Sequence, residues 1–338
     1  MRTLRISLVC AFMLGIIAAR PAVVAQTSTA IPQDYDPNFN YDCDRACLDS
    51  YVDQYLAALV AHDPSRLPLA RQVKFTENGQ QLQLGDGLWG TASGIGDYKI
   101  YADDPQAGEV MFMGTMLENG APIILNLRLR VELRRITEIE TLVARKEAGS
   151  LARPENLVTP NPLFSETVPP SERRSRQNMI AIANSYFSAI EKGHASYVPF
   201  DKDCNRIESG VQTTNNKQLA TSPDSVLGLG CADQIKTRNF QPDTLIRDRR
   251  FAVIDEERGL VFVLGFFDHD ATLRSYALAD GHGEANPYRP VDLGNRRDVQ
   301  DSGWKDHACR GHRQHRPLWN EIGLVIGTSV VVPGNPHL

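Results

Sequence analysis

The sequence predicts an α+β protein in which one unit, a helix followed by a curved antiparallel sheet, occurs twice. Apolar residues follow a helical period over residues 48–60 and again over residues 179–190. A strand period of two covers residues 125–134, between the two helices. Residues around the two helices also match in order and at constant spacing, which indicates an internal repeat.

Both helices are predicted from apolar residues at i, i+3 and i+4 spacing. The first set is Leu48, Tyr51, Val52, Tyr55, Leu56, Leu59 and Val60, and the second is Met179, Ile182, Ala183, Tyr186, Phe187 and Ile190. Gly193 is the expected end of the second helix, because glycine commonly follows the last helical residue.

The alternating segment predicts a half-buried antiparallel strand. Leu125, Leu127, Leu129, Val131 and Leu133 alternate with Asn126, Arg128, Arg130, Glu132 and Arg134. A turn is expected near residues 134–135, and residues 136–143 form the predicted return strand. A helix followed by such strands is an α+β arrangement.

The repeat is defined by pairs of identical residues at two offsets. Tyr55, Pro68, Glu77 and Gly79 match Tyr186, Pro199, Glu208 and Gly210, each 131 residues later. Gly108 and Gly114 match Gly259 and Gly265 at an offset of 151, so the second copy has a longer middle. We therefore predict units at residues 43–148 and 173–280, with a proline-rich linker at 149–172 and an atypical tail at 281–338.

The first 25 residues resemble a secretory signal peptide. Arg2 and Arg5 precede an apolar run, and Val23, Val24 and Ala25 favour cleavage after Ala25. An uncleaved membrane anchor is the alternative, although the run is short for a bilayer. The protein is therefore expected to be periplasmic or secreted, without a stable membrane span. The net charge of −5, with both signs mixed, gives no indication of nucleic-acid binding.

Export permits disulfides among the five cysteines that follow the leader. Cys43 and Cys47 are spaced to bridge at a helix start, and Cys204 is expected to pair with Cys231. Cys309 remains unpaired.

The segment Tyr55–Asp63 resembles the first helix of the ketosteroid-isomerase-like (nuclear transport factor 2-like, cystatin-like α+β) superfamily, which also includes polyketide-cyclase-like proteins and scytalone dehydratase. This resemblance implies two tandem cone-shaped units, each with its helix packed on a strongly curved sheet around an apolar pocket. Members use the pocket for cofactor-free acid–base catalysis, for ligand binding or as an interaction surface. Fold alone does not decide among these functions.

The resemblance makes Tyr55 and Tyr186 candidate hydrogen-bond donors to a developing oxyanion, with core packing as the alternative. Glu77 and Glu208 lie at or next to the position of the family's catalytic carboxylate. A carboxylate between apolar walls has a raised pKa and can act as a base near neutral pH. The alternative is a hairpin end, because Asn-Gly and Ser-Gly follow these glutamates.

The second copy is more polar than the first. Asp201, Asp203 and Arg206 surround Cys204 and can orient a polar substrate or perturb a carboxylate pKa. A solvated loop anchored by a disulfide is the alternative. His62 and His194 close the two helices, where helix capping or ligand binding is possible. Together with Arg206 and Trp89, they complete the set of candidate ligand-binding residues.

A histidine-rich stretch near the C-terminus has metal-like spacing, at His307, Cys309, His312 and His315. It falls where strand alternation is lost, so a divergent or frame-shifted tail is the preferred interpretation, and no metal site is predicted. The sequence also lacks a P-loop, a dinucleotide-binding glycine motif and a serine-hydrolase elbow, so no cofactor is predicted.

These features predict an exported, cofactor-free acid–base enzyme of the isomerase, dehydratase or lyase type. Its substrate would be a small apolar or aromatic oxygenated compound. The alternative is a non-catalytic protein that binds such a compound in the same conical pocket. Homo-oligomerisation is possible in either case.

Overall fold

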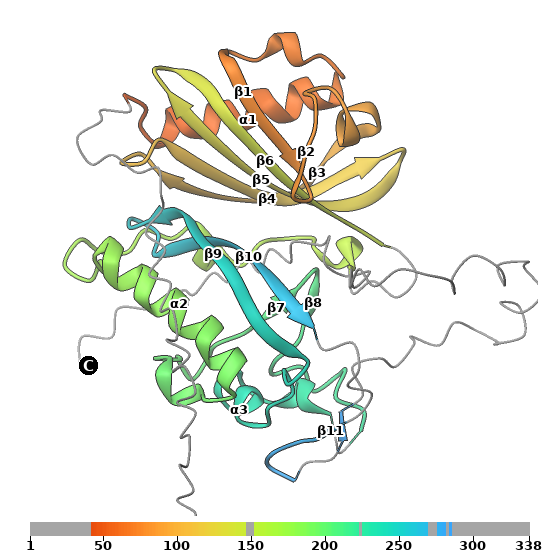
Figure 1. The fold of residues 1–338 in the computed structure, drawn as a ribbon, viewed down its shortest axis with the longest axis vertical. Coiled ribbons are helices and arrows are strands. Elements are labelled where there is room, and N and C mark those ends of the chain that lie inside the picture. The colour runs from red at the N-terminus through yellow and green to blue at the C-terminus, as the bar shows by residue number, and fades with distance from the viewer. Residues whose placement is uncertain (1–41, 147–151, 223–224, 270–275, 282–283, 286–338) are drawn as a thin grey trace, which may run out of the picture.

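A computed structural model describes residues 42–146, 152–222, 225–269, 276–281 and 284–285. It is a mixed α+β structure with few helices and strongly curved strands (Figure 1). The predicted signal peptide, Cys309, the histidine-rich stretch and nearly all of the predicted tail lie outside the described residues. Within the described residues, no helix is both long and apolar enough to cross a bilayer.

The first half contains helix α1 (Arg45–Val60) and one sheet with the strand order β2-β1-β6-β5-β4-β3. The bounds of its strands are β1 Leu69–Glu77, β2 Gln80–Gln81, β3 Ala92–Asp104, β4 Glu109–Glu118, β5 Ala121–Glu132 and β6 Arg135–Arg145. The helix forms as predicted, and its apolar side packs on the sheet around buried Leu125 and Leu127. The sheet is antiparallel throughout except where β1 pairs in parallel with β6.

The predicted strand pair is confirmed as β5 and β6, joined by a turn at Leu133 and Arg134 with positive φ angles. The expectation that β5 is half-buried is wrong. Asn126, Arg128 and Arg130 are only 5–7% exposed, although they point away from the apolar core around α1. Their face of the sheet is covered by the rest of the chain, so both faces of β5 are buried.

The second half contains helix α2 (Arg176–Lys192), helix α3 (Cys231–Lys236) and the hairpin β9–β10 (Asp243–Asp255 and Leu260–His269). Short pairs are formed by β7 (Ile207–Glu208) with β8 (Val211–Gln212), and by β11 (Tyr276–Ala277) with β12 (Glu284–Ala285). Gly193 ends α2 in the left-handed conformation, at φ 64°, as predicted. Met179, Tyr186 and Ile190 of α2 pack on the hairpin.

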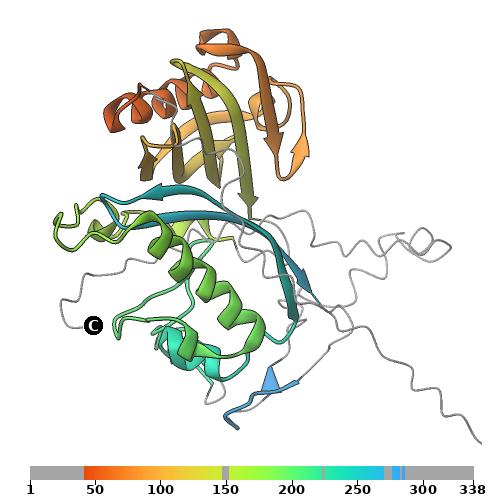
Figure 2. The same cartoon turned by 60° about the vertical axis from the view of Figure 1, so that its left-hand side comes forward.

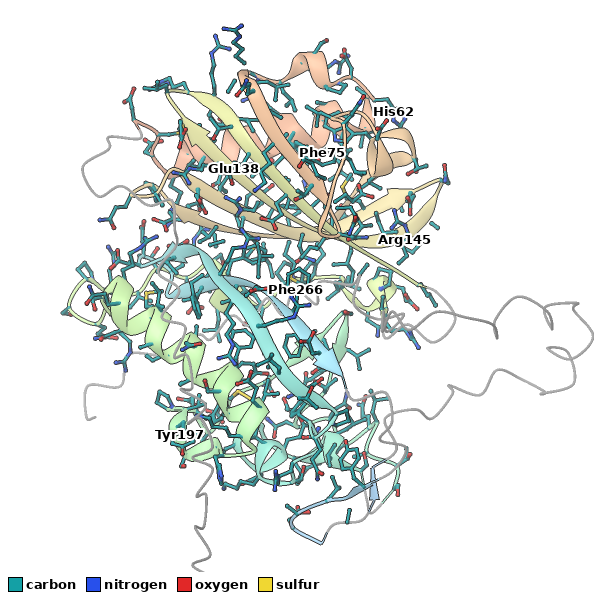
Figure 3. All side chains as sticks on the ribbon, viewed as in Figure 1. His62, Phe75, Glu138, Arg145, Tyr197 and Phe266 are labelled. Atoms are coloured by element: carbon teal, nitrogen blue, oxygen red, sulfur yellow. A yellow bond between two sulfur atoms is a disulfide. The ribbon has the colours of Figure 1, made fainter. Side chains whose placement is uncertain are left out.

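The two halves are stacked as helix, sheet, hairpin, helix (Figure 2). The hairpin β9–β10 lies against the six-stranded sheet, on the face opposite α1, while α2 covers the other face of the hairpin. Ala102, Met111 and Leu142 of the first half share one apolar cluster with Phe262 and Leu264 of the second. Side chains of both halves fill the space between them (Figure 3).

Both predicted disulfides are present, Cys43–Cys47 and Cys204–Cys231. The first closes the start of α1, where Asp44 caps the helix by accepting from the Cys47 amide at 2.9 Å. The second joins the loop before β7 to the first residue of α3. Disulfides are typical of exported proteins.

Candidate functional site

In the first half, the helix tyrosine is enclosed by a tryptophan. Tyr55 is 1% exposed, and its ring meets Trp89 edge to face with 5.3 Å between centroids. Burial raises the pKa of the Tyr55 phenol far above its usual value, so the hydroxyl stays protonated. Trp89 is also 1% exposed and fills the interior beside the tyrosine. Trp89, which the sequence suggested as a ligand-binding residue, therefore packs as a core residue.

Glu77 of the first half points inward and is held by the backbone. It ends β1, and the next two residues, Asn78 and Gly79, form the turn to β2 with positive φ angles. Its carboxylate accepts from the Leu88 amide at 2.9 Å. A Cβ at Gly87 would lie 2.7 Å from that carboxylate, so only glycine fits there. Burial raises the pKa of Glu77, against the effect of the Leu88 hydrogen bond.

The corresponding groups of the second half form a polar cluster. Tyr186 is 3% exposed, with ring contacts to Phe187 and Phe200. Among the described residues, its hydroxyl has no hydrogen-bond partner of good geometry. Burial raises the pKa of Tyr186, while the nearby Arg206 guanidinium opposes the shift. Glu208 and Asp243 also face this phenol.

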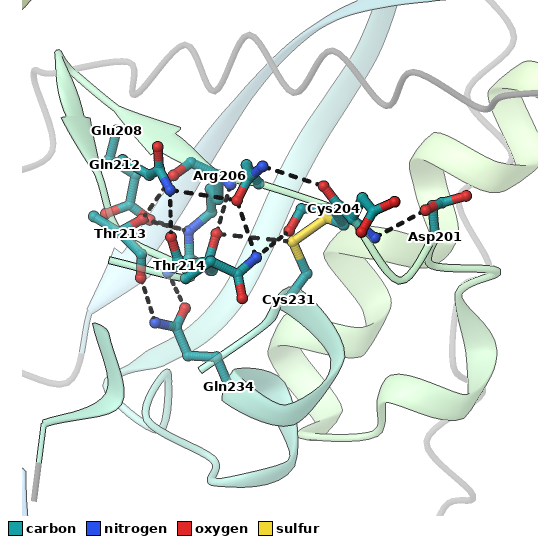
Figure 4. The surroundings of a disulfide bond; sticks show 12 residues. Asp201, Cys204, Arg206, Glu208, Gln212, Thr213, Thr214, Cys231 and Gln234 are labelled. Atoms are coloured by element: carbon teal, nitrogen blue, oxygen red, sulfur yellow. Dashed lines mark hydrogen bonds and ion pairs between the residues drawn. A yellow bond between two sulfur atoms is a disulfide. The ribbon is translucent and has the colours of Figure 1, made fainter. Parts of the chain in front are cut away.

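Arg206 is the centre of this cluster (Figure 4). Its side chain is 6% exposed and pairs with Glu208 at 2.6 Å between Nε and Oε1. Nε also donates to Thr213 at 3.0 Å, and Nη2 donates to Gln234. The guanidinium stacks over the ring of Phe240 with 4.6 Å to its centroid. This arrangement fixes Arg206 and Glu208 within the interior beside Tyr186.

The disulfide positions this cluster from two directions. Cys204 lies two residues before Arg206, and Cys231 lies three residues before Gln234 on α3. Gln234 in turn donates to the Thr213 carbonyl at 2.6 Å. The cross-link therefore holds the loop and the helix that together surround the guanidinium. The sequence did not indicate Thr213, Gln234, Phe240 or Asp243 as members of the cluster. The predicted Cys204–Cys231 pairing was the only signal that this loop and α3 lie together.

The remaining candidates lie outside the cluster. Asp201 and Asp203 sit on an exposed turn, where the Asp203 amide donates to the Asp201 carboxylate at 2.8 Å, as in the alternative of a solvated loop. His194 is exposed beside the Tyr197 ring. His62 follows α1 with a positive φ of 54°, and its Nδ1 contacts the Trp89 carbonyl. Both histidines are exposed and lie one residue beyond the helix caps, Ala61 of α1 and Gly193 of α2, so neither lines the interior.

Residues 172–303 match the model of a protein family described as a domain of unknown function (DUF8021). The matched segment begins at the end of the proline-rich linker, includes α2 and β9–β10, and extends into the predicted tail. No curated protein matches the chain.

Proposed function

We propose that the chain is a tandem of two cone-shaped units of the ketosteroid-isomerase-like type, and that the second binds a small, largely apolar oxygenated molecule. The two long helices begin at Arg45 and Arg176, 131 residues apart, as the repeat requires. Glu77 and Glu208 each end a strand before a left-handed turn. The match of these local structures supports the duplication.

The unsatisfied hydrogen bonding of the buried Tyr186 hydroxyl supports a ligand in the second unit. The Arg206 guanidinium lies close enough to donate to the phenol oxygen, but no described residue accepts from the phenol O–H, and a buried donor without an acceptor costs about 1–3 kcal/mol. Here the hydroxyl lies among aromatic rings and beside a fixed ion pair, Arg206–Glu208. A ligand oxygen that accepts from Tyr186 would remove this cost, while its apolar body would contact the rings.

Binding is favoured over catalysis because one carboxylate oxygen of Glu208 is already engaged in an ion pair. A general base must present a free carboxylate oxygen to the proton that it removes. In the second unit, Oε1 of Glu208 pairs with Nε of Arg206 at 2.6 Å, which leaves only Oε2 for proton transfer. The second candidate function is the predicted acid–base enzyme. It is favoured by the presence of the Tyr186 phenol and the Glu208 carboxylate near each other in the second unit. We assign the first unit a structural role, since Trp89 occupies its interior.

Substitution Tyr186→Phe is expected to weaken ligand binding about fivefold, because one hydrogen bond contributes about 1 kcal/mol. The ligand would first be captured from a metabolite extract by the exported chain and then titrated calorimetrically against each variant. Tyr55→Phe is the matched control and should leave the affinity unchanged. Equal loss in both variants, or in neither, would contradict a site in the second unit.

The Glu208→Gln variant separates the two functions. A binding protein shows no turnover of the captured compound with or without this substitution, whereas an enzyme shows turnover that Glu208→Gln abolishes. Detection of turnover in the unmodified chain would therefore replace the binding proposal with the enzymatic one.

A further inference from the structure

The contact between the two halves is reciprocal. Arg45, the first residue of α1, pairs with Asp255 of the second half at 2.8 Å. Arg176, the first residue of α2, pairs with Asp104 of the first half at 2.5 Å. The arginines are 131 residues apart and the aspartates 151 residues apart, which are the two offsets of the repeat. Each half therefore uses equivalent residues to bind the other.

Each of these two aspartates also accepts a hydrogen bond from a backbone amide of the other half. The Ile254 amide donates to Asp104 at 3.1 Å, and the Asp103 amide donates to Asp255 at 3.1 Å. Asp103 and Ile254 are themselves 151 residues apart. Apolar residues between these two ends also correspond in pairs, namely Ala102 with Val253, Met111 with Phe262, and Met113 with Leu264. This is the pattern of an isologous dimer interface, here within one chain.

The two ends differ in charge. At one end, Asp104 binds Arg176 through both carboxylate oxygens, and we call this the Arg176 pair. At the other end, Arg45 also contacts Asp103 and Glu257, and Arg258 lies 3.6 Å from Asp103. The groups gathered there, which we call the Arg45 cluster, are five carboxyl groups (Asp49, Asp53, Asp103, Asp255 and Glu257), three guanidinium groups (Arg45, Arg173 and Arg258) and the Tyr101 phenol.

Asp103 of the Arg45 cluster is enclosed by like charges. Its side chain is fully buried, and it faces Asp49 of α1 on one side and Asp255 of the second half on the other. Burial raises the pKa of Asp103 to about 7, with the Asp49 charge adding to the shift and Arg45 opposing it. Five carboxylates would outnumber the three guanidinium groups, so one bound proton reduces the repulsion.

We propose that the Arg45 cluster is a pH-sensitive contact that holds the halves together in mildly acidic solution and loosens as the solution becomes alkaline. A carboxyl group whose pKa is raised on folding retains its proton in the folded chain after the unfolded chain has lost it. Its contribution to stability is therefore complete below pH 4, falls as the pH rises, and is lost above about pH 7.

Hydrogen exchange of the full chain tests this proposal, because the Asp103 and Ile254 amides each report on one end of the interface. Between pH 5.5 and pH 8, we expect protection of the Asp103 amide to fall at least about tenfold, after correction for intrinsic exchange rates. Substitution Asp103→Asn, which mimics the protonated group, should abolish this fall. Asp49→Asn should move it to lower pH, because one repulsive charge is removed.

Asp104→Asn is the matched control at the Arg176 pair. It should lower protection of the Ile254 amide at both pH values while the Asp103 amide keeps its pH response. An unchanged pH response in Asp103→Asn, or protection that increases with pH in the unmodified chain, would overturn the proposal.

Discussion

Substitution Arg128→Ala is expected to lower the free energy of unfolding by about 3–5 kcal/mol, the cost of removing one partner from a buried ion pair. Arg128 is 5% exposed and lies 3.1 Å from Glu109 and 3.2 Å from Glu140, and it also pairs with Glu138. Without its guanidinium, the three carboxylates face one another between the sheet and the second half. Urea unfolding of the purified variant measures the loss.

The loss from Arg128→Ala should increase with pH. Burial already raises the pKa of Glu109 to about 7, against the attraction of Arg128 and Arg130. Removing Arg128 raises that pKa further, so the folded variant retains the Glu109 proton to higher pH than the unmodified chain does. The unfolded chain has already lost this proton, so the loss of stability grows as the pH rises through this range. Arg71→Ala, on an exposed position of β1, is the control and should change stability by less than about 0.5 kcal/mol. A comparable change in both variants would contradict a role for the buried network.

Replacing Cys204 and Cys231 together with serine should cost about 3–4 kcal/mol of unfolding free energy, because the disulfide closes a segment with a sequence separation of 27. The Cys43–Cys47 bridge spans a separation of only 4, and its removal should cost about 2 kcal/mol by the same argument. Denaturant unfolding under non-reducing conditions compares the two double variants.

The same Cys204/Cys231 variant should weaken ligand binding, since the loop that carries Arg206 and Glu208 loses its link to α3. The Cys43/Cys47 variant should bind normally. If the two variants lost equal stability, or if only the Cys43/Cys47 variant lost affinity, the role given to the longer bridge would be wrong.

Local periodicity was sufficient to predict the long helices and the central strand pair. The apolar spacing of Tyr51, Tyr55 and Leu59 defines α1, and Gly193 defines the end of α2. Both disulfides were also predicted, because residues close in sequence or in the same domain need little chain rearrangement to meet.

The sequence could not show what covers the second face of the sheet. Asn126, Arg128 and Arg130 follow a polar alternation that is typical of a solvated face, yet the second half covers them. Burial of this face depends on packing between segments more than a hundred residues apart, which local periods do not describe. The parallel pairing of β1 with β6 is non-local for the same reason.

The candidate site was predicted in part. The sequence named Tyr186, Arg206 and Glu208, which the structure brings together in one interior. It also named Asp201 and Asp203, which lie on an exposed turn, because a dense acidic segment does not reveal which way its side chains point. Asp104 and Asp255 were missed although both stand four residues before the matched Gly108 and Gly259.

Two double-mutant cycles test whether the two halves pack against each other through equivalent residues. One cycle combines Arg45→Ala with Asp255→Ala, and the other combines Arg176→Ala with Asp104→Ala, with unfolding free energies measured for each single and double variant. Both cycles should show coupling of about 1 kcal/mol or more, as residues in one ion-pair network do. Additivity within about 0.5 kcal/mol in both cycles would contradict the reciprocal contact.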